Sequence, residues 1–150
     1  MTELQRVGAL LSTEFAGGSY PASRAIDGSL NTLCGSDVLT SAHDEFLSVE
    51  VPAGSRIDYV AIWNRDDYDW ATAMLSPFEL WLTATPDTVT TESATAALCG
   101  TNLQAPGLGP FVFFCPGGHT DLRFITVILR AADSPPVRLL TITELRAYTA

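Results

Sequence analysis

The sequence predicts a single all-β domain, a β-sandwich or jelly roll with long loops at one end. Short runs of alternating, β-branched or aromatic residues recur along the chain, separated by Gly, Pro, Asp, Asn and Ser. No segment keeps an apolar period of 3.6 residues over three turns, so long helices are not expected. The 150 residues suffice for one domain with a substantial core and are too few for two.

The clearest strand is "FLSVEV" at residues 46–51, which alternates as a half-buried strand does and is followed by the turn "PAGS". Similar signals predict about eight main strands, including 57–64, 77–84, 110–115, 122–129 and 139–148, with a weaker one in "VGALLST" at 7–13. The stretch 88–99 is expected to hold one short helical turn. Residues 15–45 carry little strand signal and predict a long ordered loop, which in a small β domain is usually functional or braced by a metal.

The charge pattern excludes some classes of partner. The net charge is −9, and the eight basic residues are arginines that do not cluster. Nucleic acids and anionic membrane surfaces are therefore disfavoured, and a neutral ligand, a cation or a protein partner is expected. No apolar run is long enough for membrane insertion. The first residues do not resemble a signal peptide, so we expect a domain of a longer protein or a chain that does not use that route.

The cysteines favour a disulfide over a zinc site. There is no CxxC pair among Cys34, Cys99 and Cys115, and neither histidine lies near a cysteine pair. The Pro/Gly-rich segment between Cys99 and Cys115 is typical of a turn between two strands. It is compatible with a bridge worth roughly 3 kcal/mol, and two buried thiols in a reduced protein are the alternative. Cys34 has no obvious partner and is expected to be a buried apolar thiol.

Several motifs resemble one known family. "SYPASRAIDGSLNTL" at 19–33 resembles the opening loop of the discoidin, or coagulation factor 5/8 type C, fold through its A-x-D-G-x-x-x-T pattern. "LRFITVIL" and "LTITELRAY" resemble the closing strands of that fold. "WNRDD" and "CGTN…FVFFC" resemble the F-type lectin branch, which often has a disulfide at the matching place. The resemblance covers most of the chain and implies a jelly-roll β-sandwich that binds carbohydrate.

The resemblance also implies sugar-binding residues. F-type lectins contact sugar with a histidine, an Arg-x-Asp element and a second basic residue. The matching positions here are His43 for the histidine and Arg65 and Asp67 for the Arg-x-Asp element. The second basic residue is absent, since its place falls on Thr72 or Met74, so the resemblance does not single out fucose.

The residues of "WNRDDYDWATAM", 63–74, suit a neutral sugar by their own chemistry. Arg65 offers a planar fork of donors, and Asp67 accepts hydroxyl protons and orients that fork. Neutral His43 can donate or accept, while Tyr68 or Trp70 can cover the apolar face of a ring. The alternative is a polar turn with a local ion pair worth under about 1 kcal/mol and with Trp70 packed on the core.

A calcium site is the second implication of the resemblance, since calcium ties the opening loop of F-type lectins to the last strand. Calcium takes six to eight hard oxygens and tolerates carbonyls. The matching positions are the side chains of Asp27 and Glu144, the hydroxyl or carbonyl of Ser36, and the carbonyls of Arg24, Ser29 and Thr143. The alternative is that Asp27 is an ordinary turn residue and Glu144 pairs with an arginine such as Arg24.

The motifs of common enzymes are missing from the sequence, which has no G-x-S-x-G, H-E-x-x-H or Gly-rich phosphate loop. Catalysis is therefore not expected, and the resemblance implies a lectin-like module, extracellular or at a cell surface within a larger protein, and acting in several copies. The alternative is a structural or protein–protein interaction module, including a homo-oligomer. Trp70, Met74 and Leu75 fit that alternative, because aromatic residues and Met are enriched at protein interfaces.

Overall fold

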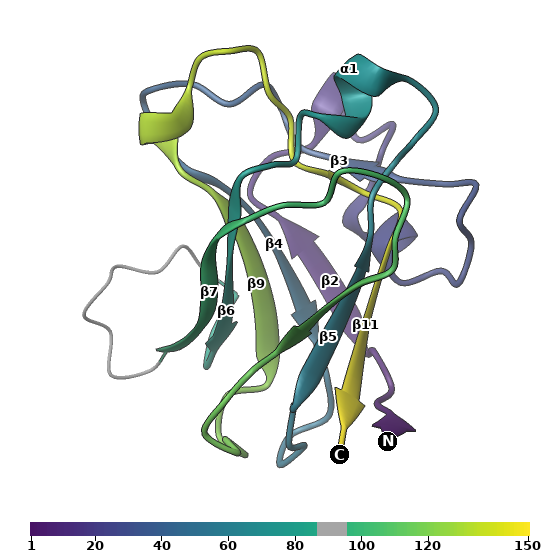
Figure 1. Cartoon of the computed structure of the whole chain (residues 1–150), viewed down its shortest axis with the longest axis vertical. Helices are drawn as coiled ribbons and strands as arrows, with labels where there is room; N and C mark the ends of the chain where they lie inside the picture. Colours follow the sequence, from purple (N-terminus) through teal and green to yellow (C-terminus); the bar gives the residue numbers. More distant parts are fainter. Residues whose placement is uncertain (87–95) are drawn as a thin grey trace.

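The computed structural model describes residues 1–86 and 96–150, and it is a sandwich of two antiparallel sheets (Figure 1). The larger sheet has the order β2 (Gly8–Leu11), β4 (Glu45–Glu50), β9 (Phe124–Leu129), β6 (Phe78–Thr83) and β7 (Ala96–Leu103). The smaller sheet has the order β1 (Thr2–Glu3), β11 (Glu144–Thr149), β5 (Tyr59–Trp63) and β8 (Phe111–Phe114). A short pair, β3 (Cys34–Gly35) with β10 (Thr141–Ile142), completes the described strands. The predicted all-β sandwich is confirmed.

The core forms where the alternating apolar residues of the two sheets meet. Leu47 and Val49 of β4 and Val60 and Ile62 of β5 are fully buried, as their alternation predicts. All six residues of β9 are buried, since this strand lies between β4 and β6 and its outer face is covered as well. Burying each such side chain contributes roughly 1.5–3 kcal/mol relative to leaving it exposed, so the strand pattern largely determines the fold.

Some elements differ from the sequence-based expectation. Of the stretch expected to hold a helical turn, residues 88–95 lie outside the described residues, and Ala96–Cys99 belongs to β7. That expectation is wrong for 96–99, because the edge of β6 offers backbone partners that override the weak local preference. The two-residue strands β1 and β3 were not predicted, since two residues are too short to show a period.

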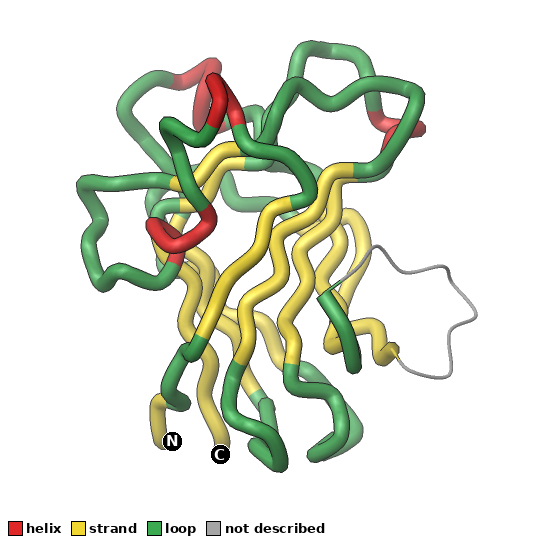
Figure 2. Tube along the Cα trace, turned by 180° about the vertical axis from the view of Figure 1, so that it is seen from behind, coloured by secondary structure: helices red, strands yellow, loops and turns green. Residues whose placement is uncertain are grey.

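The helices are single turns, and all lie at the end of the sandwich opposite the two termini (Figures 1 and 2). They are η1 (Phe15–Gly17), η2 (Ala22–Ala25), α1 (Asp69–Thr72) and η3 (Ala131–Asp133). Within the described ranges, no helix is long and apolar enough to cross a membrane. The long loops predicted for one end are therefore present, and they form the surface on which a ligand site can be built.

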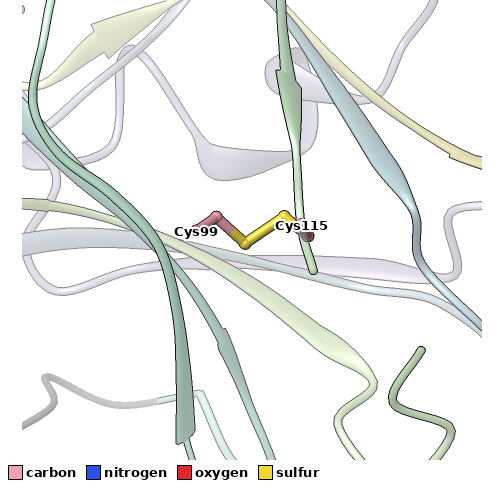
Figure 3. Close-up of a disulfide and its surroundings, with 2 residues drawn as sticks. All are labelled: Cys99 and Cys115. Atoms are coloured by element: carbon pink, nitrogen blue, oxygen red, sulfur yellow. A yellow bond between two sulfur atoms is a disulfide. The ribbon is translucent and has the colours of Figure 1, made fainter. Parts of the chain in front are cut away.

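One disulfide joins the two sheets. Cys99 in β7 is bonded to Cys115, which directly follows β8, with 4.6 Å between their Cα atoms (Figure 3). Cys34 is free and fully buried, and burial raises the pKa of its thiol to about 12. Cys34 thus lies where an apolar thiol was expected, and its sulfur is protonated at neutral pH.

Candidate functional site

The loop that follows β5 is held in place by a buried amide. Asn64 donates from Nδ2 to the carbonyls of Thr72 (2.8 Å) and Ala105 (2.9 Å), and its Oδ1 accepts from the backbone N–H of Arg65 (2.8 Å). The hydroxyl of Thr72 also donates to the carbonyl of Arg65 at 2.9 Å. Because Asn64 is fully buried, these bonds fix the backbone of Arg65 before any ligand arrives.

Arg65 and Asp67 form a two-pronged ion pair. Nε of Arg65 lies 2.8 Å from Oδ1 of Asp67, and Nη2 lies 2.6 Å from Oδ2. The hydrogen bonds from Arg65 lower the pKa of the Asp67 carboxyl, and the same bonds raise the pKa of Arg65. The pair uses two of the five N–H donors of the guanidinium, so within the described residues the others remain for a ligand. The ion pair therefore orients Arg65 without using up its donors.

Arg65 and Trp70 line a pocket of about 240 Å³, which we call the Arg65–Trp70 pocket. Trp70 is 65% exposed, and its ring centroid lies 6.0 Å from Cζ of Arg65. Phe15 and Tyr20 also line the pocket, and their ring centroids lie 6.0 Å apart. The remaining lining residues are Leu33, Gly35, Met74, Leu139 and Thr141. The pocket thus combines one cation with three aromatic rings.

The pairing of β3 with β10 places Gly35 opposite Thr141 in the lining of this pocket. Thr141 is 1% exposed, and its hydroxyl has no hydrogen-bond partner in the described part of the chain. A Cβ added to Gly35 would lie 3.5 Å from Cβ of Tyr20 and 3.9 Å from Cγ2 of Thr141, which are ordinary contact distances. A buried hydroxyl left unpaired costs about 1–3 kcal/mol, and this oxygen is closed to solvent, so Gly35 and Thr141 shape the wall of the pocket and do not offer it a polar atom.

The structure brings together some of the predicted sugar residues and not others. Arg65 and Trp70 line the same pocket, and Arg65 also lines a neighbouring hollow of about 220 Å³ together with Asp67. Thr32 and Thr143 line that second hollow as well. Tyr68 stacks on Trp70, with 5.5 Å between ring centroids and 15° between ring planes. Neither Thr72 nor Met74 supplies a cation, and Met74 lines the Arg65–Trp70 pocket with its thioether side chain.

His43 is not among the residues that line either hollow. Its Nε2 lies 3.6 Å from Oε2 of Glu45, a buried carboxylate whose other oxygen accepts hydrogen bonds from Ser12 and Thr13. The structure therefore places His43 beside Glu45 and outside the lining of both hollows.

Sequence reasoning missed the aromatic residues Phe15 and Tyr20 and the buried pair Gly35 and Thr141. Phe15 and Tyr20 are aromatic residues in a loop of small residues, but no local sequence pattern predicts that they line the same pocket as Arg65. Gly35 and Thr141 lie more than 100 positions apart in the chain and meet through strand pairing alone.

The residues of the expected calcium site lie where the opening loop meets β11. Glu144 is fully buried, and its Oε1 accepts a long hydrogen bond of 3.3 Å from the backbone N–H of Gly28, next to Asp27. Its Oε2 accepts from Arg6 at 2.8 Å and from Arg146 at 3.3 Å. Glu144 therefore pairs with these two arginines and not with Arg24, and Oε1 faces the Asp27–Gly28 turn.

The other expected ligands lie in the opening loop and in the segments next to β11. Asp27 accepts hydrogen bonds from the backbone N–H of Ser29 and the hydroxyl of Thr32, which makes it a turn residue. Ser36 is buried opposite Leu140, Thr143 directly precedes Glu144, and Arg24 lies in η2, which contacts β3 and β11. Within the described ranges, no group of three or more His, Cys, Asp or Glu side chains converges on one point. Two carboxylates and several carbonyls are donors that calcium accepts, and the weakly bonded Oε1 of Glu144 leaves capacity for a cation.

Comparisons with known proteins identify the fold. No protein-family model and no curated protein sequence matches this chain. Among solved structures, the F-type lectin (fucolectin) from striped bass (Morone saxatilis) serum matches with a TM-score of 0.73 and 17% identity, over 98% of this chain and 49% of that one. The chain thus spans about half the length of the striped bass lectin.

Two further structures match along nearly their whole length. The lectin domain of lectinolysin, solved with Lewis B antigen, has a TM-score of 0.66 and 19% identity, over 95% of this chain and 92% of that one. The family 32 carbohydrate-binding module of Clostridium perfringens NanJ, solved with galactose, has a TM-score of 0.64 and 20% identity, over 95% and 93%. The chain therefore has the discoidin-like β-sandwich fold that the F-type lectins and family 32 carbohydrate-binding modules share.

Proposed function

We propose that this domain is a non-catalytic carbohydrate-binding module whose sugar lies in the Arg65–Trp70 pocket. The observation that carries the proposal is the combination, in one small pocket, of a guanidinium oriented by Asp67 and three aromatic side chains. A sugar ring offers hydroxyls to Arg65 and an apolar C–H face to Trp70. The similar structures solved with galactose and with Lewis B antigen support this class of ligand.

The size and charge of the site favour a neutral sugar ring. The pocket volume of about 240 Å³ lies below the range of roughly 300–1,000 Å³ that holds drug-sized ligands, so it suits a single ring. The net charge of −9 opposes an acidic ligand at long range. In this arrangement Asp67 holds the guanidinium in place, and Tyr68 supports Trp70 by stacking, so both act through a neighbour. His43 remains a predicted contact that would require a ligand extending beyond the pocket.

Calcium is the second part of the proposal. Asp27 and Glu144 would supply two carboxylate oxygens, and the remaining ligands would be the hydroxyl or carbonyl of Ser36 and the carbonyls of Arg24, Ser29 and Thr143. The ion would stabilise the opening loop against β11, next to the hollow that Thr143 lines. Since Arg6 and Arg146 already balance the charge of Glu144, we expect weak binding, toward the millimolar end of protein calcium sites.

The disulfide supports a proposal for the compartment. Bridges of this kind persist in oxidising environments, so we propose that the domain works outside the cell or at its surface, as part of a larger protein. Several copies would compensate for the weak binding of each site.

A glycan array tests the sugar site, with wild type, Arg65→Ala and Gly35→Ala. We expect wild type to bind a defined set of glycans and Arg65→Ala to bind them at least tenfold more weakly, because hydrogen bonds from a charged donor are worth about 1.5–3 kcal/mol. Gly35→Ala should also weaken binding, because its methyl group enters the pocket at 3.5–3.9 Å from its neighbours without straining the fold.

Arg56→Ala is the matched control, because Arg56 pairs with Asp58 two residues later, as Arg65 does with Asp67, but near the C-terminus of the chain. If wild type binds no glycan, or if Arg65→Ala and Arg56→Ala bind alike, the proposed site is wrong. The second candidate function, a protein-interaction module, would then be favoured by the exposed side chains of Trp70 (65%) and Val137 (71%) at the loop end.

A further inference from the structure

A second and larger pocket adjoins the Arg65–Trp70 pocket. It has a volume of about 830 Å³ and shares Trp70, Met74 and Leu139 with the smaller one. Its other lining residues include Pro135, Pro136 and Val137, and we call it the proline pocket. A ligand that fills the smaller pocket and continues past Trp70 therefore enters the proline pocket.

The proline pocket is open and apolar. Trp70 is 65% exposed and Val137 is 71% exposed, and both prolines are exposed as well. Exposed apolar side chains scattered singly are ordinary on a protein surface, but a group of them around one hollow marks a place of interaction. Such a surface offers contact area to the C–H faces of sugar rings and few polar groups that would have to give up water.

A buried arginine fixes the two sides of the proline pocket relative to each other. Arg138, which follows Val137, is 3% exposed and donates from Nε to the carbonyl of Met74 at 2.9 Å. Its Nη2 donates to the carbonyls of Leu75 and Pro77, each at 2.7 Å. These bonds tie the segment that carries Val137 to the segment that follows α1. The pocket is therefore preorganised, so that ligand binding does not carry the free-energy cost of ordering its two sides.

We propose that the ligand of this domain is an oligosaccharide whose terminal ring occupies the Arg65–Trp70 pocket and whose next rings lie in the proline pocket. The inference rests on the proposed function and specifies its ligand. The volume of 830 Å³ falls within the range that encloses ligands larger than one ring, whereas 240 Å³ does not. Trp70 contributes to both pockets, and Val137 provides the apolar contact for the second ring.

Titration calorimetry with matched saccharides tests the proposal. The probes are fucose against Lewis b, and N-acetylgalactosamine against N-acetylgalactosaminyl-β-1,3-galactose, each with wild type, Val137→Asn, Val112→Asn and Arg65→Ala. We expect wild type to bind the longer member of at least one pair tenfold or more tightly than the monosaccharide. Val137→Asn should reduce that advantage at least threefold and leave the monosaccharide affinity unchanged. Val112, 57% exposed on β8 and outside both pockets, is the control and should have no effect.

The outcomes separate this inference from the proposed function. If the monosaccharides bind and the longer glycans bind no more tightly, the oligosaccharide inference is overturned and the sugar site stands. The same holds if Val137→Asn weakens both members of a pair equally. If no saccharide binds to wild type, both are overturned. The two-pocket arrangement is supported if Arg65→Ala weakens the binding of both saccharides of a pair, whereas Val137→Asn weakens only the binding of the longer one.

Discussion

The disulfide between Cys99 and Cys115 should contribute about 3 kcal/mol to the free energy of unfolding. The two residues are separated by 16 positions, and cross-linking a loop of about 15 residues removes roughly that much chain entropy from the unfolded state. Since whole domains unfold with about 5–15 kcal/mol, the bridge is a substantial part of the stability. In a chain of this length 1 kcal/mol corresponds to about 2–4 °C, so loss of the bridge should lower the melting temperature by about 6–12 °C.

Urea denaturation followed by tryptophan fluorescence measures this contribution. The proteins to compare are oxidised wild type, wild type reduced with a phosphine, and the Cys99→Ala/Cys115→Ala double variant. Reduced wild type keeps both sulfur atoms and so isolates the cross-link. The double variant also loses the packing of Cys115, which is 1% exposed, and should be less stable still. The reductant must leave the stability of the double variant unchanged, which controls for other effects of the phosphine.

The loop-closure reasoning is refuted if oxidised and reduced wild type unfold with the same free energy within the error of the extrapolation. Glycan binding provides a second check. Cys115 donates its backbone N–H to the carbonyl of Asp58, whose side chain accepts from the C-terminal residue Ala150, so the bridge lies away from the loop end. Below the urea transition, reduced wild type should therefore bind glycans as the oxidised protein does.

Three further predictions concern the titratable groups and calcium. Burial raises the pKa of Cys34 to about 12, so iodoacetamide should label it at pH 7 in urea and not in the native protein; rapid native labelling would contradict its burial. Burial alone would raise the pKa of Glu79, but hydrogen bonds from Arg130 and Trp81 lower it below the usual 4.5. At a given pH the folded state then binds fewer protons than the unfolded state, so this stabilisation is present above pH 4.5 and is lost as the pH falls through the lowered pKa. In Glu79→Gln the free energy of unfolding should fall less steeply as the pH is lowered, and the same pH dependence as in wild type would refute the assignment. Calcium at 100 times its Kd should stabilise wild type by about 2.7 kcal/mol and Asp27→Asn much less. Thermal unfolding with calcium and with chelator measures this, and an equal shift of the melting temperature in the two proteins would mean that any bound ion lies elsewhere.

Strand positions follow from the sequence because alternation and β-branched residues are local properties. The segments at 46–51, 57–64, 77–84, 110–115 and 122–129 all contain strands of the structure. The weak segment near the N-terminus contains β2, and the last segment divides into β10 and β11. The edge strand β7 was missed over its whole length, since Ala96, Ala97 and Gly100 give no alternation and the strand depends on pairing with β6.

The candidate site could likewise be predicted from the sequence only in part. Arg65, Asp67 and Trp70 lie within six positions of one another, so their grouping was visible in the sequence and the structure keeps them together. By contrast, His43 contacts Glu45, only two positions later in the chain, and the packing of β4 in the larger sheet keeps His43 out of both hollows that Arg65 lines.

The sequence by itself determined the all-β class, the position of most strands, the spacing that allows the disulfide and the polar turn that carries Arg65. Only the tertiary structure decided which residues face that arginine. Gly35 and Thr141 meet through the β3–β10 pairing, and the bonds of Arg138 to distant carbonyls hold the segment of Val137 against the segment that follows α1. Such contacts join residues that are far apart in the chain, and they form because buried polar groups must find partners, which no local pattern specifies.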